Sequence, residues 1–324
     1  MNSKLTVVMY HYVRNLSNSR YPGIKGLELS LFHRQVKFFK EKYTIVSVDE
    51  VAECIDKKQH LPENSLLLTF DDGYIDHYHN VFPILMENKI RGLFSVPGKV
   101  LAENKVLNVN KIHFILATMG EFRTQELLMK VNTLLDHYRG SEFDYPSNEE
   151  LYTKLAVANR FDNKDTIFIK RLLQAELPEQ VREIITDDLF KGCIPISESM
   201  FSKELYMNYD QIKLMKRSGM DFAVHGYDHY WLEKLSYPEI QKDITMSLEV
   251  LEGVIDRNSW TMVYPYGSYS SEVLSYISNN GCKLGFTTEV RLADVQTDAP
   301  LALPRLDTND FPPKSENYIK LCEV

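Results

Sequence analysis

Short apolar runs alternate with amphipathic segments over the first hundred residues of the chain. The runs are rich in leucine, valine and aromatic residues and are short, as in strands buried on both faces; they lie at 5–11, 44–48, 65–68 and 92–96. Between them, apolar residues recur at helical spacing, predicting helices over 31–42, 49–56 and 81–88, the first two capped by Ser30 and Asp49. This alternation predicts a parallel sheet with helices outside it.

The alternation is interrupted in the middle of the chain. Residues 99–205 predict helices instead, at 110–119, 124–137, 148–160, 165–175 and 179–190. Strands then resume at 221–225, 260–264 and 284–288, with an edge strand at 301–305 that contains Pro304. We therefore expect an α/β fold in which about seven or eight parallel strands from 1–98 and 206–324 form a complete or broken barrel, with an all-helical insertion at 99–205.

Composition narrows the classes of function. The net charge of −8 over 324 residues gives no basic surface for nucleic acid. The four cysteines are scattered without a CxxC pair, which favours a reducing compartment over a disulfide framework. The apolar run Leu5–Tyr10 is too short for a signal peptide or a transmembrane segment. The expected location is cytoplasmic, and the oligomeric state stays open.

Two adjacent carboxylates follow the third predicted strand, in the sequence Thr69–Gly73. Asp71 and Asp72 at the end of a core strand would repel one another and lose hydration, so a metal ion and a cationic or hydrogen-bonding partner are the simplest compensation. The alternative is a solvated Asp-Asp-Gly turn. In a barrel, functional side chains gather where strands end, which favours the first interpretation.

Two histidines follow the strand at 221–225. His225 and His229 are four residues apart, a spacing that places both imidazoles on one face of a helical turn, and one carboxylate would complete a two-histidine, one-carboxylate metal site. Such a pair also occurs as ordinary helix or interface histidines. Its position directly after a strand, together with the aspartate pair at another strand end, indicates one divalent metal ion.

These motifs resemble those of the polysaccharide deacetylases of the NodB homology group, carbohydrate esterase family 4. The resemblance is carried by Thr69-Phe-Asp-Asp-Gly73, by His225-x-x-x-His229 and by Pro265-Tyr-Gly267, in the order found in the family. It implies a distorted (β/α)7 barrel and metal-dependent hydrolysis of an acyl group, usually N-acetyl, from a sugar. The enzyme class would be a hydrolase of non-peptide carbon–nitrogen bonds.

The resemblance also implies roles for individual residues. Asp72, His225 and His229 would bind the metal, Asp71 would be the general base, and the backbone N–H of Tyr266 would stabilise the oxyanion. Zn²⁺ suits this ligand set, and Co²⁺, Ni²⁺, Mn²⁺ or Fe²⁺ would also fit. Substrate-binding candidates are Tyr264, Pro265 and Tyr266, although Tyr264 could equally be a packed aromatic beside a rigid proline turn.

Two features depart from the family pattern. The arginine that often holds the base is replaced by Val263, so Arg305 is the candidate partner of Asp71. The late histidine that often protonates the leaving amine is absent, because all nine histidines lie at or before residue 229. His11, at the end of the first strand, is the candidate acid, with a structural or substrate-contacting role as the alternative. His77 and His79 are expected to be surface or packing residues.

The leading hypothesis is deacetylation of an N-acetylated amino sugar, in a glycan or in a nucleotide- or lipid-linked precursor, during synthesis of a surface polysaccharide such as O-antigen or capsule. An O-acetyl esterase or amide hydrolase on the same metal site is an alternative. A barrel that has lost activity and serves as a scaffold is another. The insertion, whose first helix contains Lys111, His113 and Phe114, is interpreted as a lid or interface.

Overall fold

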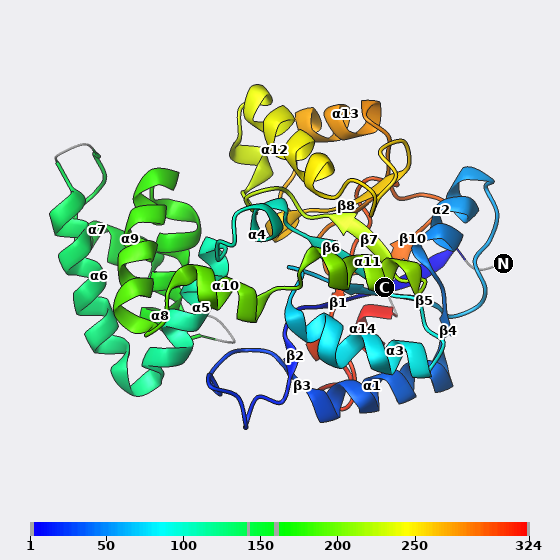
Figure 1. Cartoon of the computed structure of the whole chain (residues 1–324), viewed down its shortest axis with the longest axis horizontal. Helices are drawn as coiled ribbons and strands as arrows, with labels where there is room; N and C mark the ends of the chain where they lie inside the picture. Colours follow the sequence, from blue (N-terminus) through cyan, green and yellow to red (C-terminus); the bar gives the residue numbers. More distant parts are fainter. Residues whose placement is uncertain (1–2, 141–142, 159–161, 323–324) are drawn as a thin grey trace. The chain divides into compact units, whose positions relative to one another are not determined.

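The computed structural model describes residues 3–140, 143–158 and 162–322. Two compact units divide the chain (Figure 1). The first, the sheet unit, contains 1–15, 26–104 and 202–324, and the second, the helical unit, contains 16–25 and 105–201. The helical unit therefore includes a short N-terminal excursion, Leu16–Lys25, besides the expected insertion.

The sheet unit is built on a curled sheet. Its strands are β1 (Lys4–Tyr10), β4 (Thr44–Ile45), β5 (Ser65–Phe70), β6 (Leu93–Val96), β7 (Asp221–Val224), β8 (Trp260–Val263), β9 (Cys282–Phe286), β10 (Ala293–Asp294) and β11 (Leu306–Asp307). The order is β10-β1-β5-β6-β7-β8-β9, with β4 beside β5 and β11 beside β1. All neighbours are parallel except β10, which runs antiparallel to β1. A separate parallel pair joins β2 (Val13–Arg14) to β3 (Leu27–Glu28).

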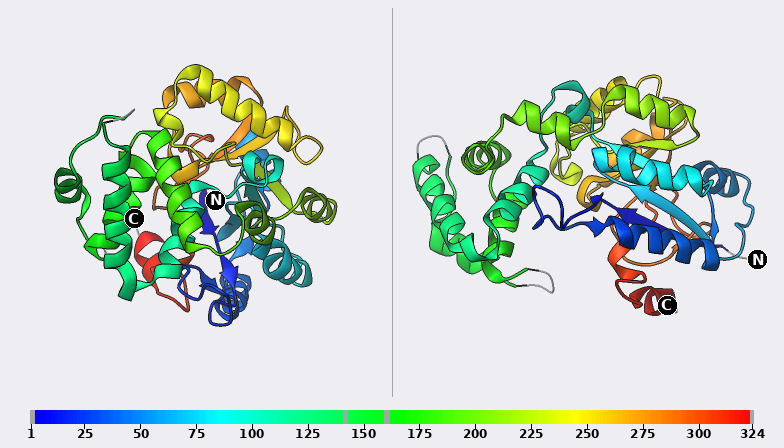
Figure 2. Two further views of the ribbon diagram at one scale, coloured as in Figure 1. Left: turned by 60° about the vertical axis from the view of Figure 1, so that its left-hand side comes forward. Right: turned by 60° about the horizontal axis from the view of Figure 1, so that its bottom comes forward.

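Helices pack around this sheet (Figures 1 and 2). They are α1 (Leu29–Lys42), α2 (Val48–Asp56), α3 (Phe82–Glu87), α4 (Gly98–Ala102), α11 (Tyr209–Arg217), α12 (Tyr237–Val250), α13 (Ser271–Asn279) and α14 (Asn317–Cys322). Shorter turns are η1 (His77–Val81), η4 (Leu232–Lys234), η5 (Pro265–Gly267) and η6 (Thr308–Asp310). The predicted α/β class is confirmed.

One buried apolar cluster fills the inner face of the sheet. Successive strands each contribute to it, with residues such as Leu5, Leu67, Leu93, Ala223, Val263 and Leu284. Helix α2 adds Val48, Val51 and Cys54 to the same cluster. Because this interior is packed with side chains, polar chemistry is left to the ends of the strands.

The helical unit contains the remaining helices. They are α5 (Asn108–Met119), η2 (Glu121–Arg123), α6 (Thr124–Tyr138), α7 (Asn148–Leu155), α8 (Lys164–Arg171), η3 (Leu172–Glu176), α9 (Glu179–Cys193) and α10 (Glu198–Leu205), the last of which continues into the sheet unit. Helices α5 and α6 both pack against α9 (Figure 2). Within this unit, Lys111 and Phe114 of α5 are buried, so their side chains belong to its interior.

Three local predictions were wrong. Helix α1 begins at Leu29 after Glu28, so Ser30 lies inside the helix and does not cap it. Helix α2 is capped by Ser47, not Asp49, because the Ser47 side chain accepts from the Glu50 N–H while the Glu50 carboxylate accepts from the Ser47 N–H. The predicted strand at 44–48 is correspondingly shortened to β4.

The strand predicted at 301–305 is also displaced, to Leu306–Asp307, and this displacement determines where Arg305 lies. Leu303 makes an isolated parallel bridge to Phe286 of β9, and β11 then pairs with β1 through Leu306 and Asp307. Pro304 lacks the N–H that a continuous ladder would need. The segment thus contacts both edge regions of the curled sheet, and it carries Arg305 between them.

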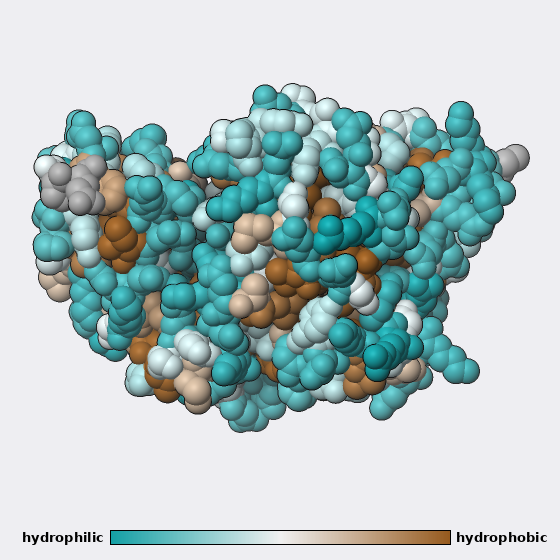
Figure 3. All heavy atoms as spheres, turned by 45° about the horizontal axis from the view of Figure 1, so that its top comes forward, coloured by the Kyte–Doolittle hydropathy of each residue, from teal (hydrophilic) through white to brown (hydrophobic). Residues whose placement is uncertain are grey.

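Polar side chains cover most of the face seen in Figure 3, with apolar groups gathered in smaller areas between them. Among the described residues, no helix has the length and apolarity needed to cross a lipid bilayer.

Candidate active site

Asp71 follows β5 directly and forms a buried ion pair with Arg305. Nη1 of Arg305 lies 3.0 Å from Oδ1 and 2.9 Å from Oδ2 of Asp71, and the two side chains are 1% and 2% exposed. The Ser95 hydroxyl at the end of β6 donates to Oδ1 at 2.9 Å. Burial by itself would raise the pKa of Asp71, but the charge of Arg305, followed by those of His225 and His11, lowers it to about 2. The carboxyl group is therefore ionised at neutral pH.

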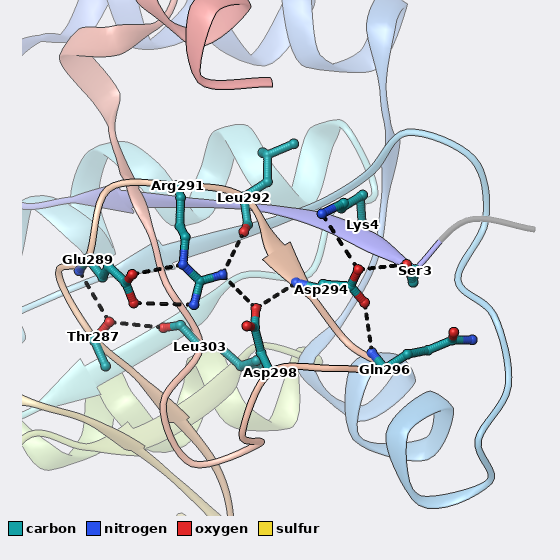
Figure 4. A network of polar contacts seen from close by, with 10 residues as sticks. All are labelled: Ser3, Lys4, Thr287, Glu289, Arg291, Leu292, Asp294, Gln296, Asp298 and Leu303. Atoms are coloured by element: carbon teal, nitrogen blue, oxygen red, sulfur yellow. Dashed lines mark hydrogen bonds and ion pairs between the residues drawn. The ribbon is translucent and has the colours of Figure 1, made fainter. Parts of the chain in front are cut away.

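Arg305 is held by the segment that follows β9. Its Nε–H donates to the Thr287 carbonyl at 2.8 Å, and its backbone N–H donates to the Glu289 carbonyl at 3.0 Å. Figure 4 shows the polar network around this segment, in which Arg291 bridges the carboxylates of Glu289 and Asp298. The arginine that faces Asp71 thus comes from a segment with its own set of tethers.

Asp72 lies next to two histidines from the turn after β7. Its Oδ1 is 3.2 Å from Nε2 of His225 and 3.4 Å from Nε2 of His229. All three side chains are buried, and their ligand atoms lie within 4.8 Å of one another. Burial would raise the pKa of Asp72, yet its contacts with His225 and His229 hold it well below its ordinary value.

The backbone after Asp71 directs Asp72 toward these histidines. Asp72 has a φ of 73° and Gly73 a φ of 66°, so two successive residues adopt the left-handed conformation. A Cβ on Gly73 would lie 2.9 Å from Val96, so glycine is required there on steric grounds as well. Tyr74 then donates its hydroxyl hydrogen to Oδ2 of Asp72. This bond turns the opposite oxygen, Oδ1, toward the histidines.

The histidine pair does not lie on a helix, and that part of the prediction was wrong. After β7 ends at Val224, the segment His225–His229 forms an irregular turn with φ values of 67° at Gly226 and 59° at His229. A left-handed residue at the second position prevents a helical turn from forming there. The imidazoles nevertheless converge, because the turn folds back on itself; their ring centroids are 4.8 Å apart.

Hydrogen bonding sets the tautomer of His225. Its Nδ1–H donates to the Val263 carbonyl at 2.7 Å, which leaves the lone pair of Nε2 directed toward Asp72. Burial lowers the pKa of His229 more than its neighbours raise it, so this histidine favours the neutral form. Burial would lower the pKa of His225 as well, but its contact with Asp72 and the charge of Asp71 raise it. Because a metal ion needs neutral imidazoles and an ionised carboxylate as ligands, its binding would release a proton held by His225.

His11, the candidate acid, follows β1. It is among the groups that lower the pKa of both Asp71 and Asp72. The His11 carbonyl accepts a hydrogen bond from Nε2 of His77 at 2.9 Å. His77 is fully buried, and burial lowers its pKa to about 4, which keeps it neutral as a packing residue. His79 is exposed.

The turn after β8 places Tyr266 beside the histidines, whereas Tyr264 is buried away from them. Tyr266, with a φ of 58°, places its ring against His229 at a centroid distance of 4.7 Å and stacks on Trp231 at 4.4 Å. Tyr264 is fully buried, and its hydroxyl donates to the Leu301 carbonyl at 2.7 Å. Since a buried ring offers no surface to a sugar, the packing alternative holds for Tyr264. Pro265 is buried beside it.

The donor set fits a divalent metal ion. Tetrahedral zinc with ligand bonds of about 2.0–2.1 Å places neighbouring ligand atoms roughly 3.3 Å apart, and the carboxylate–imidazole separations are 3.2 and 3.4 Å. Asp71, Asp72 and Arg305 together carry a net charge of about −1 when the histidines are neutral, which a divalent cation would compensate. Asp72, His225 and His229 would hold it.

Comparison with known proteins shows which family this chain resembles. The family model described as polysaccharide deacetylase matches residues 143–285, which include the histidine turn and the turn after β8. Over residues 143–285 the chain is therefore similar to the polysaccharide deacetylase family. The description of this family agrees with the predicted enzyme class. Thr69–Gly73 lies outside the matched segment and joins the same site through the fold.

The individual proteins that this chain resembles are distant from it in sequence. YxkH of Bacillus subtilis (strain 168), named as a polysaccharide deacetylase, is 23% identical over 168 residues, which are 51% of this chain and 55% of that protein. The Streptococcus pyogenes deacetylase PplD, solved in complex with acetate, superposes with a TM-score of 0.59 at 19% identity, covering 100% of both chains. IcaB from Ammonifex degensii gives 0.57 at 18% identity, covering 99% of this chain and 97% of that one. The predicted barrel-type fold is confirmed.

The sequence did not single out several residues of this candidate site. Ser95 donates to the base candidate, Tyr74 orients Asp72, and Trp231 stacks on Tyr266. Ser95 and Trp231 carry no motif of their own, because their partners are 24 and 35 residues away. Tyr74 had one available signal, its place immediately after the glycine of the first motif.

Proposed function

We propose that this chain is a metal-dependent hydrolase that removes the acetyl group from an N-acetylated amino sugar of a glycan or glycan precursor. One observation carries the proposal. A buried carboxylate neutralised by an arginine, Asp71 with Arg305, adjoins a buried carboxylate directed at two imidazoles. Two adjacent aspartates in such different surroundings can perform two different tasks.

Asp72, His225 and His229 are the proposed ligands, and Zn²⁺ is the proposed ion, with Co²⁺, Ni²⁺, Mn²⁺ and Fe²⁺ as substitutes. A bound divalent ion would supply Lewis-acid polarisation of the acetyl carbonyl and would lower the pKa of water at the site. The Nδ1–H bond of His225 to the Val263 carbonyl fixes the ring that presents Nε2 to the ion.

Asp71 is the proposed general base. It accepts the proton of the attacking water on a carboxylate oxygen, and the hydrogen bonds from Ser95 and Arg305 keep that carboxylate in one orientation. Arg305 also keeps the carboxylate ionised until the proton arrives. Arg305 thus takes the role of the arginine that often holds the base, which Val263 replaces in this chain.

Two further groups complete the proposed reaction. The backbone N–H of Tyr266, in the left-handed turn beside His229, is the proposed donor to the developing oxyanion. His11 is the proposed acid that gives a proton to the leaving amine as the C–N bond breaks. Its effect on the pKa of both aspartates supports this role.

The test is a panel of N-acetylated sugars, free, nucleotide-linked and lipid-linked, incubated with the full chain and followed by mass spectrometry. We expect loss of one acetyl group with appearance of a free amine and acetate. Release of acetate from O-acetyl esters without any free amine would replace N-deacetylation by esterase activity. Absence of both products from a metal-loaded protein would favour the scaffold alternative.

A further inference from the structure

The turn that carries both histidines is stabilised by contacts with neighbouring elements of the fold. Between His225 and His229 the backbone makes neither a helix nor a strand, and Gly226 and His229 both have positive φ. Such a turn has no regular ladder of hydrogen bonds to keep its shape. The position of two side chains that must converge on one ion therefore depends on contacts with neighbouring elements.

Asp243 of α12 supplies one set of these contacts. Its Oδ1 accepts from the Tyr227 N–H at 2.9 Å, and its Oδ2 accepts from the Asp228 N–H at 3.1 Å. These are two of the three backbone N–H groups that lie between the two histidines in sequence. One carboxylate thus spans the centre of the turn.

The first two residues of helix α4 donate hydrogen bonds to carbonyl groups of the turn. The Gly98 N–H donates to the Gly226 carbonyl at 3.0 Å, and the Lys99 N–H donates to the Tyr227 carbonyl at 2.9 Å. The amides of the turn are thus bound by α12 and its carbonyls by α4. A Cβ on Gly226 would lie 3.1 Å from Oδ1 of Asp243, so the close approach of this carboxylate also fits the glycine.

The carboxylate is costly where it lies. Asp243 is 6% exposed, and burial raises its pKa to about 6 although the two N–H donors act in the opposite direction. A residue that served only to pack α12 against the sheet would avoid this cost by being apolar. The hydrogen bonds from the turn to Asp243 offset the cost of burying its carboxylate.

We propose that Asp243 is a positioning residue that sets the affinity of the histidine turn for its divalent metal ion. The proposal rests on the metal site of the proposed function and assigns no contact between Asp243 and the ion or the substrate. Loss of one of its two hydrogen bonds would let the turn adopt other conformations, so His225 and His229 would meet Asp72 less often.

The experiment compares the full chain with D243N, which keeps the size of the side chain but replaces one acceptor oxygen by an NH₂ group facing a backbone N–H. Binding of Co²⁺ to the metal-free proteins is measured by competition with a chelator and by the visible absorption of the ion. We expect the dissociation constant of D243N to be about 10- to 100-fold higher, as for other residues that orient metal ligands.

Thr245→Val is the matched control, because Thr245 lies on the same helix but its hydroxyl is bonded to the Tyr276 hydroxyl at 3.0 Å. It should bind Co²⁺ as the unaltered chain does. D243E, which keeps both oxygens but shifts them by one methylene, serves if D243N does not fold, and its affinity should also fall. A folded D243N or D243E with unchanged Co²⁺ affinity would overturn the inference.

A second readout separates positioning from general damage. Activity of D243N should return toward that of the unaltered chain when Co²⁺ is raised above the new dissociation constant, whereas a loss that excess Co²⁺ does not repair contradicts the inference. Failure of the unaltered chain to bind Co²⁺ would instead reject the metal site itself. Different results would therefore reject the positioning role of Asp243 and the metal site itself.

Discussion

Both units of this protein bury charged side chains, but they balance them differently. In the helical unit, Lys111 is 2.5 Å from Asp187 and 2.7 Å from Glu198, and Glu198 also pairs with Lys105. These four charges cancel. In the sheet unit, Asp71 and Asp72 face one arginine, and the histidines beside them accept or donate according to their tautomer. The first cluster is complete as it stands, whereas the second is short of positive charge by about one unit when both histidines are neutral.

The contrast separates two uses of burial. A closed ion-pair cluster between helices contributes specificity or stability and needs no further ligand. A cluster of the same residue types at strand ends, with a deficit of positive charge and imidazole nitrogens directed inward, is suited to bind a cation. Burial of charge alone would not have distinguished the units; the charge balance and the donor atoms do.

Removal of a metal ligand should give the largest effect. We expect His225→Ala to lower deacetylation by about 10³-fold or more, because the ion would lose one of three ligands and with it several kcal/mol of transition-state stabilisation. Metal content by mass spectrometry should fall well below one ion per chain. Lys111→Met, in the closed cluster, should retain its metal. Full activity of His225→Ala in chelator-treated buffer would contradict the assignment.

Arg305→Met tests the other half of the strand-end cluster. It leaves Asp71 as a buried charge without its main partner, so the free energy of unfolding should fall by about 3–5 kcal/mol in urea denaturation. The double variant Asp71→Asn with Arg305→Met should recover much of this loss, since neither charge then remains. A double variant as unstable as the single one would show that Arg305 acts mainly through other contacts.

Lys111→Met should cost less than Arg305→Met although it breaks two ion pairs. The side chains of Asp187 and Glu198 are 33% and 19% exposed, so water can solvate them once the lysine is gone, and we expect a loss of about 1–3 kcal/mol in the free energy of unfolding. The same denaturation measurement serves, with Co²⁺ affinity as the control that should not change. A loss larger than that of Arg305→Met would reverse the order of the two clusters.

We expect the smallest effect from acid, which should gradually remove the contribution of the closed cluster to stability. Burial would raise the pKa of Glu198, but its bonds with Lys111, Lys105 and the Val106 N–H hold it below the usual value of 4.5. Because the folded pKa is depressed, this contribution to stability is present above about pH 4.5 and is lost as pH falls through the folded pKa.

Glu198→Gln should therefore reduce stability at neutral pH and flatten its decline between pH 5 and 3, as followed by thermal melting across that range. Glu126 is a useful comparison: its pKa is also lowered, by Arg123 and Lys130, but it lies on the surface, where water weakens such pairs. Glu126→Gln should leave the melting temperature almost unchanged. An unaltered acid slope in Glu198→Gln would contradict the role given to Glu198.

The sequence predicted the strand ends well because each functional group follows a short apolar run. Asp71, His225 and His11 each come one residue after the last residue of a strand, and parallel strands bring such positions to one edge. The pairing of Arg305 with Asp71 was predicted only by replacing a missing arginine, since their 234-residue separation leaves no local pattern.

Local geometry was harder to predict than position. The histidine spacing suggested a helical turn, but Gly226 at the second position adopts a left-handed conformation that ends that possibility. The groups that hold the site, Tyr74, Ser95 and Asp243, are ordinary polar residues in the sequence. Their importance depends on which backbone or carboxylate atoms the fold brings beside them, and that information is in the tertiary structure.

The ion pair between Asp71 and Arg305 has a consequence for synthesis of the chain on the ribosome. The two residues are 234 positions apart, and at about 5–20 residues per second the arginine is added roughly 10–50 s after the aspartate. Throughout that interval the emerging polypeptide has its first motif but not the cation that allows the motif to be buried. The site is therefore complete only after residue 305 has been added, and a chain released before that residue would retain both aspartates and lack the cation that pairs with the first of them.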